Sequence, residues 1–580
     1  MAKDESEGDL TKVIPPTELH EPELQSFFQY FLRRIASHRN KAEMFAQNEH
    51  ALSSARDLES QRIQEAQSAE LNNWAQALLE NAWAACQEPG GGKCPKLTPV
   101  TDTSTAGLPP LPSEKQIKQL LHTILFIHLT TSKAYHAHTR AFLSTFGPLD
   151  EDAIAATLKN PEHAVREVDR KSKTDQAKEE QAERNKTLRR VGLGLAAVGG
   201  GVLVGMTGGL AAPFVGAGVT TVLGWVGVGG TAAGMLASGL AGSSVVCGAL
   251  FGAYGSKKSA EMVSRYIKEV EDLAIVPVRE PRETLAVRLC VSGWLESSED
   301  VSAPWTVLGG EDTFALQWEV EALMNLSNAL YNLVRSQAMQ YLKSQIIKQT
   351  IFAALAAALS PTAWLKIGQI IDNPWMTAKA RASKTARVLG VLIAERVLGN
   401  RPITLVGYSL GGQVIFEALQ YLATLPPEQT AGLVQDVFLF GAPVPADESA
   451  WASVRRVVSG RLVNGYSTND YILAVLARAS GVSWGVSGLK AVEVQGVENV
   501  ECKEVDGHLK WRGMVGRCLQ QAGAPGVQDD QVEAQLKNKE KQIEKVLDLS
   551  KHDVKKILKQ GDGSDEMQEK EAAGAENKEG

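Results

Sequence analysis

Cysteine is scarce in this sequence, and its six cysteines are scattered along 580 residues at Cys86, Cys94, Cys247, Cys290, Cys502 and Cys518. The first eight residues are mostly polar and have no apolar core, which is not the pattern of a secretory signal. Scattered cysteines without such a signal indicate reduced thiols, and they predict a protein that faces the cytosol. No second cysteine pair or nearby histidine accompanies Cys86 and Cys94, so we expect neither a metal site nor a cofactor.

Charge is absent from one long segment. Residues 191–255 contain no Asp, Glu, Lys or Arg, and 20 of these 65 residues are glycine. A membrane-spanning helix takes about 20 apolar residues, so the segment has the length for two spans. Arginines precede it and lysines follow it, which favours a transmembrane hairpin with both ends in the cytosol. The alternative is a soluble glycine-rich hairpin that packs against the rest of the protein or inserts reversibly, since each glycine weakens a helix by about 1 kcal/mol relative to alanine.

The chain is too long for a single core, so several domains are expected. Its formal net charge of -7 argues against nucleic acid as the main partner. The predicted organisation is a disordered start (1–22), a helical N-terminal region (23–190), the glycine-rich segment (191–255), a helix and linker (256–283), an α/β domain (284–523) with a helical insertion (320–400), and a charged helix with a disordered tail (524–580).

Apolar residues at helical spacing predict helices over 23–86 and 114–146 in the N-terminal region. His136 and His138 lie two residues apart in the second helix and point to different sides, so we expect them on the helix surface rather than as a metal pair. Residues 528–560 follow coiled-coil spacing only loosely, which gives a weak prediction of a coiled coil.

From residue 284 onward, short β-branched runs alternate with helical patterns, which is typical of a parallel α/β sheet. The predicted strands are 285–291, 314–318, 403–406, 437–440, 461–466 and 491–497. The insertion between the second and third strands is helical, with breaks near Pro361 and Pro374 and a final helix over 377–398. It either covers the active site as a lid or thickens the domain, and the sequence leaves both open.

The motif Gly407-Tyr408-Ser409-Leu410-Gly411 joins the third of these strands to the following helix. Glycines two residues either side of a serine allow the tight turn that lifts its hydroxyl above the ends of the strands. A strand before the motif and a helix after it indicate the nucleophile elbow of an α/β-hydrolase fold, with Ser409 as the nucleophile. The alternative is an ordinary strand–helix turn in which the serine has no catalytic role and only caps the helix.

In this fold the nucleophile is followed in the chain by an acid and then by a histidine. Only His508 and His552 follow Ser409, and His552 lies in the charged C-terminal helix, so His508 is the predicted base. Asp470 follows the strand over 461–466 and is the predicted acid, with Asp447 in reserve. The alternative role of Asp470 is to cap the helix that begins at residue 471.

The oxyanion of an acyl-transfer reaction needs two N–H donors near the nucleophile. The first is the backbone N–H of Leu410, at the start of the helix after the elbow. The second is expected in the loop after the first strand, where Gly293 permits close approach of the backbone and the N–H of Trp294 or Leu295 is the candidate.

The sequence resembles the transmembrane and coiled-coil domain-containing protein 4 family in four motifs, at residues 407–412, 440–444, 464–471 and 506–508. The resemblance covers about residues 115–520, including the glycine-rich segment. It implies an α/β-hydrolase-like, membrane-associated and lipase-like protein in which Ser409, Asp470 and His508 form the triad.

These observations support three hypotheses on function. The leading one is a serine hydrolase on an intracellular membrane, with its catalytic domain facing the cytosol, which cleaves a lipid or another acyl ester. The second is an inactive or weakly active hydrolase fold that acts as a membrane scaffold or trafficking adaptor, binding protein partners through the N-terminal helices and the charged C-terminal helix. The third is a thioesterase or protein deacylase, which the sequence does not separate from a lipase.

Overall fold

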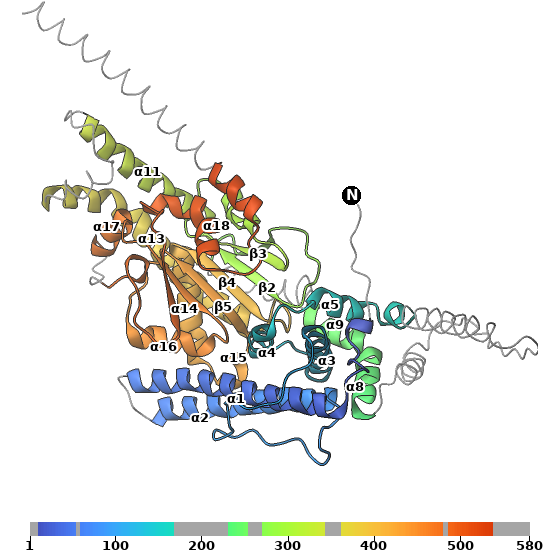
Figure 1. Cartoon of the computed structure of the whole chain (residues 1–580). Coiled ribbons are helices and arrows are strands. Elements are labelled where there is room, and N and C mark those ends of the chain that lie inside the picture. The colour runs from blue at the N-terminus through green and yellow to red at the C-terminus, as the bar shows by residue number, and fades with distance from the viewer. Residues whose placement is uncertain are drawn as a thin grey trace, which may run out of the picture.

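The computed structural model describes residues 10–53, 58–166, 230–252, 270–342, 361–479 and 485–537. It shows a mixed α/β unit and a helical N-terminal region that lies along one end of it (Figure 1). Each part has its own apolar core.

A seven-stranded sheet runs through the α/β unit in the order β1-β3-β2-β4-β5-β6-β7. Its strands are β1 (Ala274–Pro277), β2 (Val287–Val291), β3 (Asp312–Gln317), β4 (Ile403–Tyr408), β5 (Val434–Phe440), β6 (Leu462–Tyr466) and β7 (Val497–Glu501). All neighbouring strands are parallel except β1 and β3, which are antiparallel. Strands β2, β4 and β5 are buried along their whole length because helices cover both faces, which explains their continuous apolar sequences.

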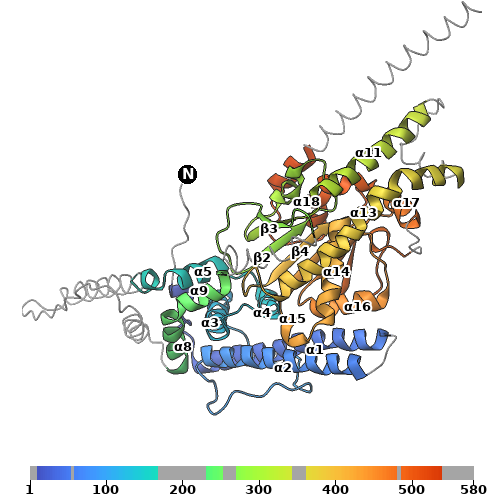
Figure 2. The same ribbon diagram turned by 180° about the vertical axis from the view of Figure 1, so that it is seen from behind.

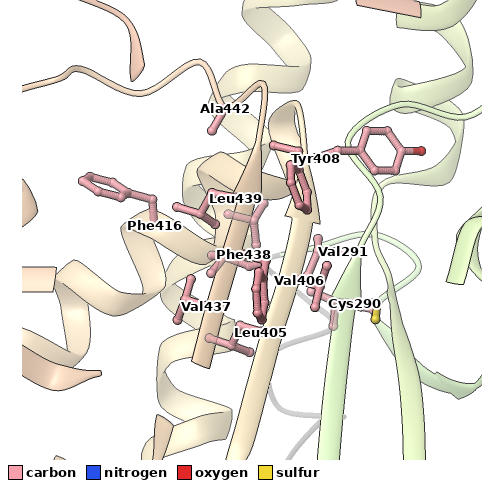
Figure 3. Packing of buried hydrophobic residues seen from close by; sticks show 14 of the residues in the cluster. Cys290, Val291, Leu405, Val406, Tyr408, Phe416, Val437, Phe438, Leu439 and Ala442 are labelled. Atoms are coloured by element: carbon pink, nitrogen blue, oxygen red, sulfur yellow. The ribbon is translucent and has the colours of Figure 1, made fainter. Parts of the chain in front are cut away.

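The centre of this core is visible in Figure 3. Leu405 of β4 lies beside Val437 of β5, and Val406 of β4 lies beside Cys290 of β2. Phe416, on the helix that follows β4, points away from the strands, and its ring centroid lies 4.9 Å from that of Trp451. This packing holds the end of β4 rigidly in the middle of the sheet.

The sheet differs from the prediction at its two edges. β1 was expected to be part of a linker, but it pairs antiparallel with β3 as an edge strand, where the proline at its end is tolerated. The last strand was expected over 491–497 and instead begins at Val497. The preceding loop is ordered by the Asn499 side chain, which donates to Val492 O and accepts from Val492 N, so apolar residues there are buried without a strand partner.

The helices of the α/β unit are α11 (Val320–Leu342), α13 (Pro361–Ala394), α14 (Leu410–Thr424), α15 (Pro427–Thr430), α16 (Glu448–Val457), α17 (Tyr471–Ala479) and α18 (Trp511–Gln521). The break expected at Pro374 is wrong, because α13 continues through this residue as one helix. α13 packs along α14 over one face of the sheet (Figure 2). α13 therefore thickens the domain, whereas α11 reaches the loop after β2, where the Tyr331 hydroxyl donates to Glu296. Residues 343–360 lie outside the described residues.

The N-terminal region contains a long hairpin of α1 (Glu21–Leu52) and α2 (Leu58–Ala85), followed by α3 (Glu114–Ser132), α4 (Ala137–Leu143) and α5 (Glu151–Lys159). α3 begins after Ser113, whose capping box with Gln116 matches the expected cap. The helix expected over 114–146 is interrupted at Lys133, which has a left-handed backbone conformation with φ of 56°. α1 packs on α16 and α2 on α15, which joins the hairpin to the α/β unit.

The expected disorder of residues 1–22 is wrong for the part that the structure describes. Leu10, Val13 and Ile14 are buried in the N-terminal core. The Thr123 hydroxyl of α3 donates to Val13 O at 2.7 Å, and the Gln119 side chain donates to Ile14 O at 2.8 Å. A few apolar residues in a polar stretch are enough to anchor it, because α3 supplies both the groove and the hydrogen bonds.

Only the end of the glycine-rich segment is described, as α8 (Gly230–Ala241) and α9 (Ser243–Phe251). α8 packs on α3 so closely that a Cβ on Gly239 would lie 2.8 Å from the Thr130 side chain. The last turn of α9 is held by Asn400 N, which donates to Ala249 O at 3.1 Å. The rest of the predicted hairpin, residues 191–229 and 253–255, lies outside the described residues.

No helix among the described residues is by itself long and apolar enough to cross a bilayer. By length and composition alone, one pair of helices has that capacity together: Thr231–Ala241 and Ser243–Phe251, which are bent by 65° relative to each other. Residues 538–580, which include most of the predicted C-terminal helix and tail, lie outside the described residues.

Of the two histidines predicted on a helix surface, His138 is buried and His136 is half-buried, between α1, α2 and α4. The ring centroids of His136 and His138 lie 5.5 Å apart, and both rings contact Trp74 of α2. Burial lowers the pKa of His38 and His128 to about 4 and that of His136 to about 3. These four histidines form a buried histidine cluster that is uncharged at neutral pH.

This cluster predicts a loss of stability in weak acid. The unfolded chain binds protons at histidine near pH 6.5, whereas the folded chain does so only near pH 4, so stability falls as the pH drops from about 6.5 toward 4. Each such histidine lowers the free energy of unfolding by about 1.4 kcal/mol per pH unit in this window. We expect urea midpoints that decrease clearly between pH 7 and pH 5. His138→Phe replaces the imidazole by a ring that cannot be protonated, so it should reduce the change of the urea midpoint with pH. His163→Phe, at an exposed position, should not reduce it. An equal change of the urea midpoint with pH in both variants would contradict this account.

Candidate active site

β4 ends in Tyr408, and α14 begins at Leu410, so Ser409 alone forms the turn between them. Ser409 has φ of 55° and ψ of -130°, a backbone conformation that costs a non-glycine residue about 1–3 kcal/mol. The turn is packed tightly against the end of β2, since a Cβ on Gly411 would lie 2.0 Å from Val291 O. The glycine in this position is therefore required by contact with β2.

A continuous chain of hydrogen bonds starts at this serine. Ser409 Oγ lies 2.6 Å from His508 Nε2. On the other side of the ring, His508 Nδ1 lies 2.7 Å from Asp470 Oδ2. All three side chains are fully buried, with 0% of their surface exposed. In this arrangement the imidazole can accept the Ser409 proton while the carboxylate holds the ring in one tautomer.

The structure also locates the other three aspartates that lie between Ser409 and His508 in the chain. Asp447 caps α16, where its side chain accepts from Ala450 N at 2.8 Å. Asp436 lies at the start of β5, at the opposite end of the sheet, where it accepts from Arg461 N at 2.7 Å. Asp506 forms an ion pair with Lys510. Asp470 alone among these four lies against the His508 ring, and it also caps α17 by accepting from Leu473 N at 3.0 Å.

Trp511 is part of this site and was missed by sequence reasoning. Its indole Nε1 donates to Asp470 Oδ2 at 2.8 Å, the same oxygen that accepts from His508. The indole packs on Gly441, where a Cβ would lie 2.4 Å from the ring. Its place three residues after His508 is the one sequence signal that points to it. Trp511 therefore holds the Asp470 carboxylate in position against the His508 ring.

Trp511→Phe is expected to slow the reaction of Ser409 with an acylating or phosphonylating reagent by about 10- to 100-fold, because a hydrogen bond to a charged group contributes about 1.5–3 kcal/mol. The rate constant of labelling by a fluorophosphonate measures this, and the reagent concentration for half-saturation should change little. Trp451→Phe is the matched control, because Trp451 Nε1 is also buried but donates to Pro445 O at 2.9 Å. Equal rates in the two variants would show that the bond to Asp470 has no such effect.

The loop after β2 lies directly beside the elbow, as predicted. A Cβ on Gly293 would lie 2.1 Å from Tyr408 O and 2.5 Å from Leu410 N. Trp294 and Leu295, the two candidate donors, are buried, and Trp294 O accepts from the Tyr408 hydroxyl at 3.1 Å. Leu410 is the first residue of α14, and the first N–H groups of a helix have no partner inside it. The structure thus brings the predicted donor loop and the Leu410 N–H together next to Ser409.

Ion pairs between charged residues hold this loop in place. Arg512, next to Trp511, forms ion pairs of 2.6 Å with both Glu296 and Asp300. Its guanidinium also lies over the Trp294 ring, 5.2 Å from the ring centroid. The residue after Trp511 therefore holds the loop after β2 in place, while Trp511 itself holds the Asp470 side chain.

Comparison with known proteins places this chain in a recognised family. Residues 185–524 match a family described as "Protein of unknown function (DUF726)". The chain is 35% identical over 367 residues to an uncharacterized membrane protein of Schizosaccharomyces pombe, 61% of this chain and 63% of that protein. It is 36% identical over 342 residues, 57% of this chain, to the transmembrane and coiled-coil domain-containing protein STS1 of Oryza sativa, of which 51% is covered.

A third relative is the probable lipase MIL1 of Saccharomyces cerevisiae, with 34% identity over 313 residues, 53% of this chain and 29% of that protein. The chain thus spans 29% to 63% of the length of these three relatives. No solved structure matches the chain. The family match covers more than half of the sequence and contains Ser409, Asp470 and His508, and on this basis the chain belongs to the DUF726 family.

Proposed function

We propose that this protein is a serine hydrolase with an α/β-hydrolase fold that cleaves an acyl ester. The observation that carries the proposal is the buried chain of hydrogen bonds from Ser409 through His508 to Asp470. The three residues come from the ends of β4, β6 and β7 or the loops that follow them, in the chain order typical of this fold. The strained backbone at Ser409 supports a role beyond capping α14.

In this mechanism Ser409 Oγ attacks the acyl carbonyl while His508 Nε2 accepts its proton. The negative charge that develops on the carbonyl oxygen is stabilised by the Leu410 N–H and by an N–H of Trp294 or Leu295. His508 then donates the proton to the leaving alcohol, and water releases the acyl group by the same steps in reverse. Asp470, held by Trp511, stabilises the imidazolium in both stages.

The proposed substrate is a membrane lipid or another long acyl ester, and the proposed location is an intracellular membrane with the site on the cytosolic side. One relative is named a probable lipase, and others are named membrane proteins. The apolar pair α8–α9 is consistent with a membrane contact near the α/β unit. Because Ser409 is fully buried, a substrate reaches it only after covering residues move, and a membrane surface is one environment that would favour such a movement.

The test is hydrolysis by the purified full-length protein of a panel of esters, thioesters and vesicle lipids, each with and without prior fluorophosphonate treatment. Release of a fatty acid or alcohol that the inhibitor abolishes supports the proposal. The pattern across the panel separates a lipase from a thioesterase. Labelling of Ser409 without turnover of any panel member would reject the proposed substrate class. Absence of both labelling and turnover, with the folded state intact, would favour the alternative of a membrane scaffold that binds partners through its N-terminal helices.

A further inference from the structure

A cavity of about 770 Å³ lies at the end of the sheet opposite Ser409. It is bordered by the first residues of β5, β6 and β7, by α1, and by the segment around α4. Strands of five to seven residues separate it from the candidate active site, which corresponds to roughly 16–23 Å. The cavity therefore belongs to neither the Ser409 site nor its substrate path, and it lies where the N-terminal hairpin meets the α/β unit.

The most unusual group that lines this cavity is Arg455. Its side chain is 3% exposed, and two of its nitrogens donate to Val458 O at 2.9 Å and to Gly460 O at 2.7 Å. Its guanidinium lies 4.1 Å from the centroid of the Phe45 ring of α1. Within the described residues, its Nε has no hydrogen-bond partner and no carboxylate forms an ion pair with it. Burial lowers the pKa of Arg455 to about 10, yet the group stays charged at neutral pH.

The acidic groups near Arg455 are occupied by other partners. Glu498 pairs with Arg461 at 2.7 Å, and Asp436 accepts from Arg461 N at 2.7 Å. Arg140, which also lines the cavity, is paired with Glu151 at 2.8 Å. Asp436 and Glu498 attract Arg455 from a distance and raise its pKa, but neither forms an ion pair with it among the described residues. An anion in this cavity would therefore give the buried guanidinium a direct counter-charge.

Two more buried atoms beside Arg455 also lack a hydrogen-bond partner among the described residues. They are Ser459 Oγ, in a residue that is 7% exposed, and His38 Nε2. Both residues line the same cavity, and Lys41 lies at its exposed rim. A hydroxyl, an imidazole N–H, a guanidinium N–H and an ammonium group are all donors to oxyanions. This combination is the chemistry of a phosphate- or carboxylate-binding site.

We propose that the cavity between α1 and the starts of β5–β7 is a second binding site, which takes the phosphate group of a small molecule or lipid headgroup through Arg455, Ser459, His38 and Lys41. The volume exceeds that of a phosphate ion, so the ligand carries further atoms, and the apolar surfaces of Phe45 and Leu149 are available to contact them. A bound ligand would bridge the N-terminal hairpin and the strands whose far ends lead to Asp470 and His508.

The test is binding to the purified full-length protein, with two probes that separate the sources of the phosphate. Glycerol 3-phosphate represents a soluble ligand, measured by calorimetric titration, and vesicles containing phosphatidic acid represent a lipid headgroup, measured by co-sedimentation. We expect saturable binding of one of them at one molecule per chain. Ser459→Ala should weaken it by about 10-fold or more, because it removes a hydrogen bond to a charged group. Lys41→Gln should weaken it to a similar extent, and Arg455→Gln should abolish it.

Lys115→Gln is the matched control, because it removes one exposed lysine from α3 away from the cavity and should leave the affinity unchanged. Arg455→Gln also removes bonds to two backbone carbonyls, so its folded state is checked, and the conclusion rests on Ser459→Ala and Lys41→Gln if it unfolds. The proposal is overturned if neither probe binds, if Ser459→Ala and Lys41→Gln bind like the wild type, or if Lys115→Gln weakens binding as much as they do. Fluorophosphonate labelling of Ser409 is measured in the same samples, so a failure here is distinct from a failure of the proposed hydrolase activity.

Discussion

Ser409→Ala is expected to abolish covalent labelling by a fluorophosphonate and to lower kcat for ester hydrolysis by about a million-fold, the cost of removing the nucleophile from a serine–histidine–acid site. The cause is the loss of the hydroxyl oxygen that lies 2.6 Å from His508 Nε2. Gel-based detection of the labelled protein and a continuous ester assay measure the two effects. The folded state should persist, because alanine needs no hydrogen bond at this position and takes less space than serine.

Ser453→Ala serves as the control for this variant. Ser453 lies on α16, where its hydroxyl donates only to Ala450 O at 2.8 Å, so its removal should leave labelling and turnover unchanged. If Ser409→Ala were labelled as strongly as the wild type, Ser409 would not be the nucleophile, and the proposed function would lose its basis.

Asp470→Asn is expected to lower kcat by about ten thousand-fold with little change in KM. Asp470 Oδ2 accepts from both His508 Nδ1 and Trp511 Nε1, and an amide can present a donor in place of this acceptor. The imidazole would then be held in the tautomer that has no free acceptor for the Ser409 proton. The same loss should appear in the rate of fluorophosphonate labelling, since that reaction needs the same proton transfer.

Asp447→Asn is the matched control, because Asp447 was the other candidate acid. Its side chain caps α16, and asparagine caps a helix about as well as aspartate, so both stability and turnover should stay near the wild-type values. A comparable loss of turnover in Asp447→Asn and Asp470→Asn would mean that neither carboxylate is specifically the partner of His508.

The sequence predicted the centre of the sheet well because β2, β4 and β5 are buried on both faces. Such strands are continuous apolar runs and need no knowledge of their neighbours to be recognised. β1 and β7 lie at the edges, where pairing depends on what the adjacent strand offers, and there the prediction failed or was shifted. The single helix through Pro374 was missed for a similar reason, since packing along α14 outweighs the local cost of the proline.

The geometry of the candidate site was predictable to the extent that chain order constrains it. Strand ends meet at one edge of a parallel sheet, so the positions of Ser409, Asp470 and His508 after their strands were enough to bring them together. Trp511 and the buried histidine cluster had no such constraint, because their contacts come from elements that are distant in the sequence. His136 and His138 looked like surface residues of a helix, and only the position of α1 and α2 made them part of a core.

The close contact of α8 with α3 determines which residues belong to one folding unit. The family match begins at residue 185, yet Leu236, Leu240 and Leu250 within it share one core with α1–α3, which precede the match. The unit of sequence similarity is therefore smaller than the unit of folding. A polypeptide limited to residues 185–524 would expose this apolar surface to water, so the segment that the family shares depends on the N-terminal helices to cover it.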